Sequence, residues 1–272
     1  MKIIVKRLSV LFVIVAILVL IGTIGFSVIE NLSLFDAFYF TVVTIATVGY
    51  GDISPLTVGG RVLAIILITT GVGTFAGMFV NTTQLLVERR DEQIRGRRIN
   101  TLIGLYFTEV GSHMLHMFTG WDTGREQLGE AAHIEQQWNS RDFTRLKKRL
   151  QNYKYNLDHK IIEYKRLNEF LGEKSDMLFR MLENTSLTER ESFTELLRAT
   201  FHLREELAFR EEFTGLPESD LKHLAIDARR VYRLVTILWV DHMFYMKTSY
   251  PYLFALSLRI NPFKNDSSPI VK

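Results

Sequence analysis

A stretch of nine residues combines glycines, threonines and an aspartate in an order that could bind a dehydrated cation: Thr44-Ile45-Ala46-Thr47-Val48-Gly49-Tyr50-Gly51-Asp52. Gly49 and Gly51 lack a Cβ atom and can adopt positive φ at little steric cost, so the backbone around Tyr50 can alternate its handedness. The carbonyl oxygens from Thr47 to Tyr50, including that of Val48, would then form a ladder above the Thr47 hydroxyl. Such a ladder can replace the water shell of a K⁺ ion.

The oxygen ladder of one chain can line only one side of an ion, which has to be surrounded. The motif occurs once in the sequence, so we expect a homotetramer in which three identical subunits complete the site. A Gly-rich turn in a globular protein is the alternative interpretation. The apolar segments on either side favour the ion site, because they lie at the distances that a pore requires.

The segment Thr47–Gly51 and its flanks resemble the selectivity filter of potassium channels, in particular the two-helix prokaryotic pore modules. The resemblance covers about residues 8–88. It implies that Asp52 supports the filter and that the inner helix bends at Gly71 or Gly73. Close packing of helices is the alternative role of these two glycines.

The resemblance also implies that Ala76 and Val80 line the inner pore. Two positions depart from the compared channels. Some of those channels place a glutamate at the position of Val43, where it pairs with the filter aspartate, so Asp52 needs another partner here. Calcium-gated members carry a glutamate at the position of Val80, so an acidic inner ring is missing at this level.

Two uncharged segments, residues 8–28 and 62–87, are long enough to cross a membrane, because about 20 apolar residues span the hydrocarbon core. A signal peptide is the alternative for the first segment, but no Ala-x-Ala cleavage site follows it. Residues 34–46 predict a pore helix with Ser33 as N-cap and Asp36 at position N3. This helix is too short to span the bilayer and would be buried against protein.

Charged residues are distributed unevenly along the 272 residues, which include 33 Lys and Arg and 30 Asp and Glu. We therefore expect a pore domain at 1–88, a basic juxtamembrane linker at 89–98 and a helical cytosolic domain at 99–272. The net charge of +3 is too small to indicate a nucleic-acid partner. The absence of cysteine excludes disulfides and thiolate metal sites.

Basic residues flank both predicted membrane segments. Lys6 and Arg7 precede the first, and five arginines between Arg89 and Arg98 follow the second. The positive-inside rule then predicts a multi-pass protein of the plasma membrane with both termini in the cytoplasm. The five arginines could also bind anionic lipids of the bilayer, although topology alone accounts for them.

The cytosolic part predicts an all-α domain, because its apolar residues repeat with a period near 3.6 and glycines are few. We expect helices at residues 99–118, 125–138, 141–171, 174–184, 189–213 and 218–248. In residues 143–171 an apolar seven-residue repeat predicts either an axial coiled coil between subunits or one helix of an intramolecular bundle. The bundle is the commoner arrangement.

Glu109, His113 and His116 would share one face of a helix, and Glu130 and His133 have the Glu-x-x-His spacing of helical di-iron bundles. Those bundles need a second copy of the spacing, which the sequence does not provide, so ordinary surface or core histidines are the favoured interpretation. A pair of nucleophile and base that would indicate an enzyme is also not readable from the sequence.

The sequence thus predicts an all-α membrane protein with two spanning helices, a pore helix, a selectivity filter and a helical cytosolic domain. Its function would be that of a tetrameric channel, not an enzyme, that conducts K⁺ passively and is gated through the inner helix by the cytosolic domain. K⁺ ions in the filter would be the bound ligand, without a further cofactor. The alternatives are a pore fused to a helical metal-binding or enzymatic module, and the pore subunit of a K⁺ transporter.

Overall fold

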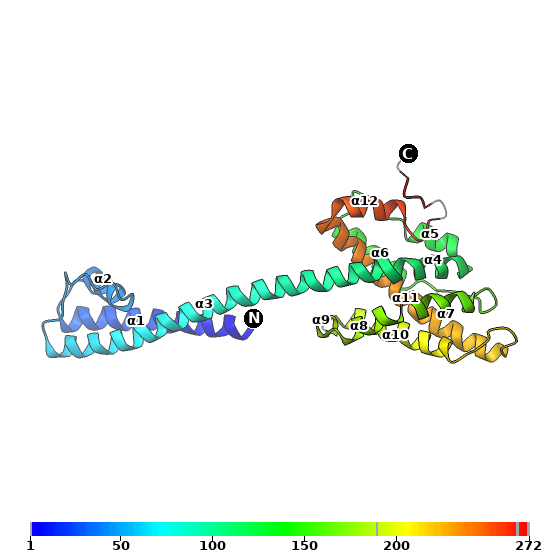
Figure 1. The fold of residues 1–272 in the computed structure, drawn as a ribbon. Helices are drawn as coiled ribbons and strands as arrows, with labels where there is room; N and C mark the ends of the chain where they lie inside the picture. Colours follow the sequence, from blue (N-terminus) through cyan, green and yellow to red (C-terminus); the bar gives the residue numbers. More distant parts are fainter. Residues whose placement is uncertain (1, 189, 265–266, 271–272) are drawn as a thin grey trace. The chain divides into compact units, whose positions relative to one another are not determined.

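The computed structural model describes residues 2–188, 190–264 and 267–270. Residues 1 and 272, at which the two predicted domains begin and end, lie outside these ranges. The described regular elements are helices, and the chain divides into two compact units, Met1–Ile94 and Arg95–Lys272 (Figure 1). The predicted all-α fold class is confirmed.

The first unit contains α1 (Lys2–Ile29), α2 (Leu34–Ile45) and most of α3 (Val58–Tyr106). The predicted cap of the pore helix is present, because the Ser33 hydroxyl accepts a hydrogen bond from the Asp36 backbone N–H at the start of α2. A small apolar core holds the unit together and consists of Phe26, Ala37, Ile45, Ala64 and Leu67.

Two helices of the structure are long and apolar enough to cross a membrane, as predicted: Lys6–Ile29 of α1, and α3. Only 6% of the most apolar 18-residue stretch of α1 consists of buried residues. Large side chains such as Phe12 and Leu20 are more than half exposed within the single chain. A water-soluble protein rarely leaves so large an apolar surface uncovered. The exposed apolar surface therefore fits a protein embedded in lipid.

Helix α3 extends well beyond the predicted span at residues 62–87. It includes the arginine-rich stretch 89–98, which is helical throughout and was expected to be a linker. Arg, Glu and Gln are good helix formers, so the change from apolar to charged residues alters the surroundings of the helix without ending it. The five arginines of this stretch are exposed.

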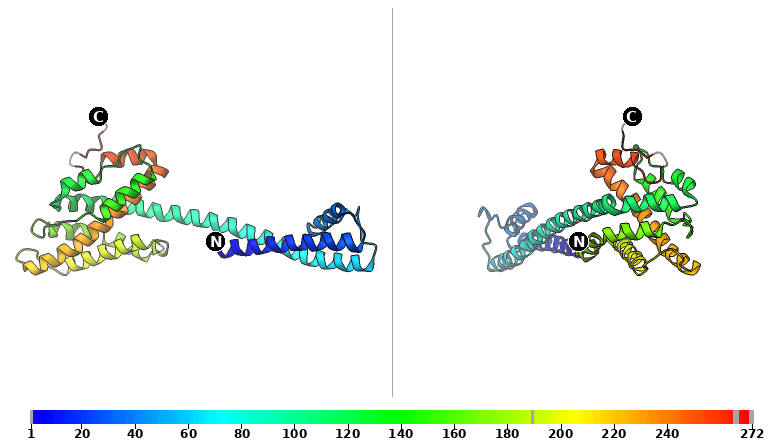
Figure 2. Two further views of the ribbon diagram at one scale, coloured as in Figure 1. Left: turned by 180° about the vertical axis from the view of Figure 1, so that it is seen from behind. Right: turned by 45° about the vertical axis from the view of Figure 1, so that its right-hand side comes forward.

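The second unit is a bundle of short helices around one long helix. α11 (Glu218–Ser249) packs against α4, α6, α10 and α12, and Figure 2 shows this helix from two further sides. The other elements are η1 (Phe107–Gly111, a π-helical turn), α4 (Ser112–Trp121), α5 (Arg125–Ala131), α6 (Ser140–Gln151), α7 (Tyr164–Glu173), α8 (Ser175–Glu183), α9 (Thr185–Thr188), α10 (Glu191–Ala208) and α12 (Pro251–Arg259).

The core of this unit is apolar and well filled. Phe118, Leu167, Leu203 and Val235 are completely buried and come from α4, α7, α10 and α11. Phe254 of α12 is also buried, so the short apolar segment after α11 is docked on the bundle as a helix.

The prediction of one continuous helix at residues 141–171 is wrong. Helix α6 ends at Gln151, and the next helix, α7, begins only at Tyr164. The Tyr155 hydroxyl donates to the carbonyl of Leu150 at the end of α6. Leu157 pairs with Asp122 through an isolated backbone bridge. The apolar residues of the repeat, among them Leu146, lie in the core of this unit. This packing corresponds to the intramolecular bundle, and the unbroken helix that an axial coiled coil requires is not formed.

Two other expected helices have different bounds. The helix expected at 125–138 ends at Ala131, where α5 stops. The helix expected at 99–118 is instead the end of α3, then the π-helical turn η1, then α4. Such turns insert one residue into a helix and rotate the residues that follow, an effect that apolar periodicity does not reveal.

Candidate functional site

Positive φ angles occur at every second residue of the predicted filter. The angle φ is +60° at Thr47, +56° at Gly49 and +77° at Gly51, whereas Val48 and Tyr50 do not share this conformation. When left-handed and right-handed residues alternate, successive N–H groups turn to one side of the chain and the carbonyl groups to the other. The observed backbone therefore has the alternation that a ladder of carbonyl oxygens requires.

Thr47 also follows the C-cap of the pore helix, Ala46, and takes part in the turn that ends this helix. The N–H of Val48 donates to the carbonyl of Val43 at 3.0 Å, and the N–H of Thr47 donates to the carbonyl of Thr44 at 3.1 Å. These two bonds form a Schellman motif, whose left-handed residue is usually glycine. A β-branched residue with positive φ is rare. A threonine in this place puts a hydroxyl at the first residue of the predicted filter despite the conformational strain.

The filter segment is uncovered within one chain. The side chain of Val48 is 52% exposed and that of Tyr50 is 71% exposed. A Cβ atom added at Gly49 or at Gly51 would meet no described atom within 4 Å. Among the residues that the structure describes, the space beside these two glycines is therefore open.

Asp52 has a neighbouring polar group on the preceding helix, whereas the valine at position 43 offers it no partner. The hydroxyl of Tyr39, on α2, lies close enough to the Asp52 carboxylate to interact with it electrostatically. This interaction relates the residue after the predicted filter to the helix that precedes it. Tyr39 shares its hydroxyl chemistry with Thr41 and Thr44 of the same helix, so no sequence pattern marked it as the neighbour of Asp52.

Glu30 links the end of α1 to the start of α3. Its carboxylate accepts hydrogen bonds from the backbone N–H groups of Leu56 at 3.0 Å and Thr57 at 3.1 Å, and from the Thr57 hydroxyl. These bonds, the hydroxyl of Thr57 first, hold the pKa of Glu30 below its ordinary value. Sequence reasoning missed this role, although Glu30 is the one acidic residue between the first spanning segment and the pore helix.

The two candidate hinge glycines have different surroundings. A Cβ atom added at Gly71 would lie 3.3 Å from the Cα atom of Ile45 at the end of α2. Gly71 therefore lets α3 approach the pore helix closely. A Cβ atom at Gly73 would meet no described atom within 4 Å, so packing within the chain gives no reason for a glycine there.

The two predicted lining residues of the inner pore, Ala76 and Val80, lie one turn apart on α3 and are both exposed within the single chain. Val80 borders a hollow of about 670 Å³, which Ile4 and Arg7 of α1 also line. Ala76 does not line this hollow and is exposed. Val80 thus lies on the side of α3 that faces the beginning of α1.

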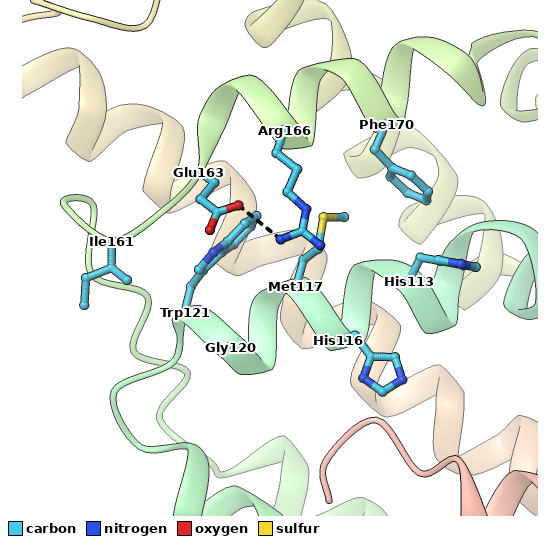
Figure 3. Close-up of a pocket in the computed structure, with 9 residues that line it drawn as sticks. All are labelled: His113, His116, Met117, Gly120, Trp121, Ile161, Glu163, Arg166 and Phe170. Atoms are coloured by element: carbon cyan, nitrogen blue, oxygen red, sulfur yellow. Dashed lines mark hydrogen bonds and ion pairs between the residues drawn. The ribbon is translucent and has the colours of Figure 1, made fainter. Parts of the chain in front are cut away.

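In the second unit, the two histidines that had been considered as metal ligands line a hollow of about 430 Å³. Figure 3 shows His113 and His116 on α4, opposite Arg166 and Phe170 of α7. Arg166 forms an ion pair with Glu163 at 3.1 Å, so its charge is already balanced within the hollow.

The remaining members of the candidate metal cluster point elsewhere. Glu109 forms an ion pair with Lys174 at 2.9 Å. His133 lies 3.9 Å from Glu135 and is about half exposed. Within the described ranges, three or more His, Asp or Glu side chains do not gather in a way that could hold a metal ion. The spacing of Glu130 and His133 therefore does not produce a ligand set.

Comparisons with known proteins identify both units. A family model described as an ion channel matches residues 12–88. A second family model, described as the C-terminal helical domain of the uncharacterized protein MJ1433, matches residues 95–259, more than half of the chain. The helical domain, which the sequence alone had left without a family, thus has described relatives.

Three related proteins come from Methanocaldococcus jannaschii. The uncharacterized protein MJ1433 is 38% identical over 197 residues, which are 71% of this chain and 79% of that protein. Probable potassium channel protein 2 is 36% identical over 88 residues, 32% of this chain and 26% of that protein. Potassium channel protein 1 is 36% identical over 83 residues, 30% of this chain and 25% of that protein.

The chain spans about a quarter of the length of these two potassium channel proteins. No solved structure matches the chain. The resemblance of the pore segment to potassium channels is confirmed, and the relatives point to an ion channel and not to an enzyme.

Proposed function

The chain belongs to the family of the uncharacterized protein MJ1433 and carries an ion channel domain at residues 12–88, and from this premise we propose that it forms a tetrameric K⁺-selective channel. The observation that carries the proposal is the alternation of positive φ at Thr47, Gly49 and Gly51. This backbone can direct consecutive carbonyl oxygens toward one axis. A dehydrated K⁺ ion would exchange its water shell for these oxygens and pass in single file.

The same geometry supports the proposal that four chains surround the filter. One chain offers one set of oxygens, and the backbone at Gly49 and Gly51 has free space beside it. Three further copies would surround the ion and cover the exposed Val48 and Tyr50 side chains. Asp52, with the Tyr39 hydroxyl nearby, would support the outer end of the filter in each subunit.

The second unit would act as the regulatory part of the channel. We place it in the cytoplasm together with the N-terminus of a plasma-membrane protein, because the arginines from Arg89 to Arg98 follow the second apolar segment. The same arginines could contact anionic lipid head groups. Movement of α3 at Gly71 or Gly73 would open and close the inner pore, past Ala76 and Val80.

Ion flux into liposomes tests the proposal. The purified full-length protein should pass K⁺ and Rb⁺ far better than Na⁺. The Gly49→Ala variant should lose this selectivity, because a Cβ atom disfavours positive φ. Gly172→Ala is the matched control, since Gly172 lies in α7 with open space around it and no positive φ. Equal K⁺ and Na⁺ flux through the unmodified protein, or a monomer by native mass measurement, would disprove the proposal.

A further inference from the structure

Four basic side chains line one hollow of the second unit. The hollow has a volume of about 650 Å³, which is in the range of small-molecule sites. Arg229, Arg230 and Arg233 reach it from α11, and Lys154 reaches it from the segment that follows α6. Among the residues that the structure describes, Glu195 of α10 is the acidic residue in its lining.

The three arginines crowd one face of α11. Residues three and four positions apart are neighbours on a helix surface, and like charges at these spacings repel each other. Together with Lys154 and Glu195, they leave a formal excess of three positive charges in the hollow. Such a cluster reduces the stability of the helix unless an anion neutralises it.

The described residues neutralise little of this charge. Arg230 lies 3.5 Å from the Glu195 carboxylate, but both side chains are more than half exposed, so the ion pair is weak. For Arg229, the structure provides only the Leu157 carbonyl at 3.5 Å, and its buried Nε atom has no hydrogen-bond partner among described atoms. Within the described ranges, Arg233 has no carboxylate at ion-pair distance.

In the hollow beside His113, by contrast, the positive charge is already neutralised. Its arginine, Arg166, already pairs with Glu163 inside the same hollow. The arginines of α11 therefore form the stronger candidate for binding an anion.

We propose that the hollow at Lys154, Arg229, Arg230 and Arg233 binds a polyphosphorylated anion. The planar guanidinium group donates paired hydrogen bonds that match phosphate oxygens. A single carboxylate would cancel one of the three excess charges, whereas two or more linked phosphate groups can cancel them all. Free polyphosphorylated molecules and the head groups of polyphosphorylated lipids share this chemistry.

Binding of inorganic triphosphate to the purified full-length protein tests the proposal. Triphosphate should raise the melting temperature in a saturable way, and its affinity should decrease as salt concentration rises. Arg229→Gln combined with Arg233→Gln should weaken binding at least tenfold. Arg145→Gln, at an exposed arginine of α6 outside the hollow, is the control and should bind as the unmodified protein does.

Two further measurements separate the loss of paired hydrogen bonds from the loss of charge and from unfolding. Arg229→Lys combined with Arg233→Lys retains the charge without the paired hydrogen bonds and should bind with intermediate affinity. Circular dichroism should show the same helix content in all variants without triphosphate.

The source of the phosphates is distinguished with phosphatidylcholine vesicles that contain phosphatidylinositol bisphosphate. Binding of triphosphate without vesicle binding supports a free ligand, and vesicle binding that requires the arginines supports a lipid head group. No binding of either probe, or equal binding by the double glutamine variant and the control, would overturn the proposal. Binding is read without ion flux, so this outcome is independent of the test of channel function.

Discussion

The Glu30 carboxylate accepts hydrogen bonds from the hydroxyl and the backbone N–H of Thr57, which immediately precedes α3. The Thr57 hydroxyl in turn accepts a hydrogen bond from the N–H of Gly60 at 3.0 Å. Thr57 thus caps the helix, and Glu30 fixes that cap to the end of α1. This pair joins the two membrane-spanning helices on the side where the filter ends.

Substitutions at two adjacent glycines test how much the contact between Glu30 and Thr57 contributes to stability. A Cβ atom at Gly60 would overlap the Glu30 carboxylate, whereas a Cβ atom at Gly59 would lie 3.3 Å from an Ile29 methyl group. We expect Gly60→Ala to displace Glu30 and to melt several degrees below Gly59→Ala in thermal unfolding. Glu30→Ala should melt at the same temperature with or without Gly60→Ala, because the link is already lost. A further decrease in the double variant would assign the effect of Gly60 to another contact.

The contact between Tyr39 and Asp52 should stabilise the conducting filter. Tyr39→Phe removes only the hydroxyl, and Asp52→Asn removes the charge. We expect each to speed the decay of K⁺ current during sustained recording from bilayers, and the double variant to decay no faster than the worse single variant, because the two groups act as one pair. Tyr252→Phe, at a residue that is 93% exposed, should leave the decay unchanged. Additive effects of the two substitutions would show that the pair does not act as a unit.

The contrast between Gly71 and Gly73 separates packing from bending. Gly71→Ala should lower the melting temperature, since the added methyl group has to push α3 away from the backbone of Ile45. Gly73→Ala should raise it slightly, because replacing an unconstrained helical glycine by alanine favours the helix by up to about 1 kcal/mol. If Gly73→Ala also lowers the open probability in single-channel recordings, Gly73 is the hinge. Equal melting temperatures of the two variants would contradict the packing role of Gly71.

His242 makes the stability of the second unit depend on pH. Its ring stacks on Phe107 with centroids 4.6 Å apart, and burial lowers the pKa of the imidazole from 6.5 to about 4. Between these pH values the unfolded chain binds a proton that the folded chain does not. The contribution of His242 to stability should therefore be constant above pH 6.5 and decrease as the pH falls toward 4, by at most about 3 kcal/mol.

Melting temperatures at pH 7.5, 6 and 5 measure this effect. His242→Phe keeps an aromatic ring against Phe107 but cannot bind a proton, so its melting temperature should decrease less on acidification. His133→Phe replaces a half-exposed histidine and should behave as the unmodified protein. The same decrease in the His242→Phe variant and the unmodified protein would exclude His242 as the cause.

The helices and turns of the pore domain were predictable because nearby residues determine them. The length of the two uncharged segments predicted the spanning helices, and Ser33 and Asp36 predicted the start of α2. The glycines predicted where φ could become positive. Tyr39 and Glu30 were missed because their partners lie 13 and 27 positions away and nothing in the sequence marks such pairs. The left-handed Thr47 was also missed, since threonine rarely adopts that conformation.

The error at residues 141–171 has a physical cause. A seven-residue apolar repeat describes which side chains are buried, but buried side chains of a loop can continue the same spacing. Here the loop is held by contacts to a distant segment, such as the hydrogen bond from Tyr153 to Asp122 across 31 positions. The family of the helical domain could not be deduced from periodicity for the same reason, because periodicity is common to all bundles.

The double role of Thr47 has a mechanical consequence. Its left-handed backbone both closes the last turn of α2 and begins the alternation of the filter. If Thr47 turned to the right-handed region, the bonds from Val48 to Val43 and from Thr47 to Thr44 would break together. Collapse of the filter would then also unfold the last turn of α2. Bound ions that stabilise the filter would stabilise this helical turn as well. Loss of K⁺ should therefore expose the amides at the end of α2 to hydrogen exchange, in step with the closing of the filter.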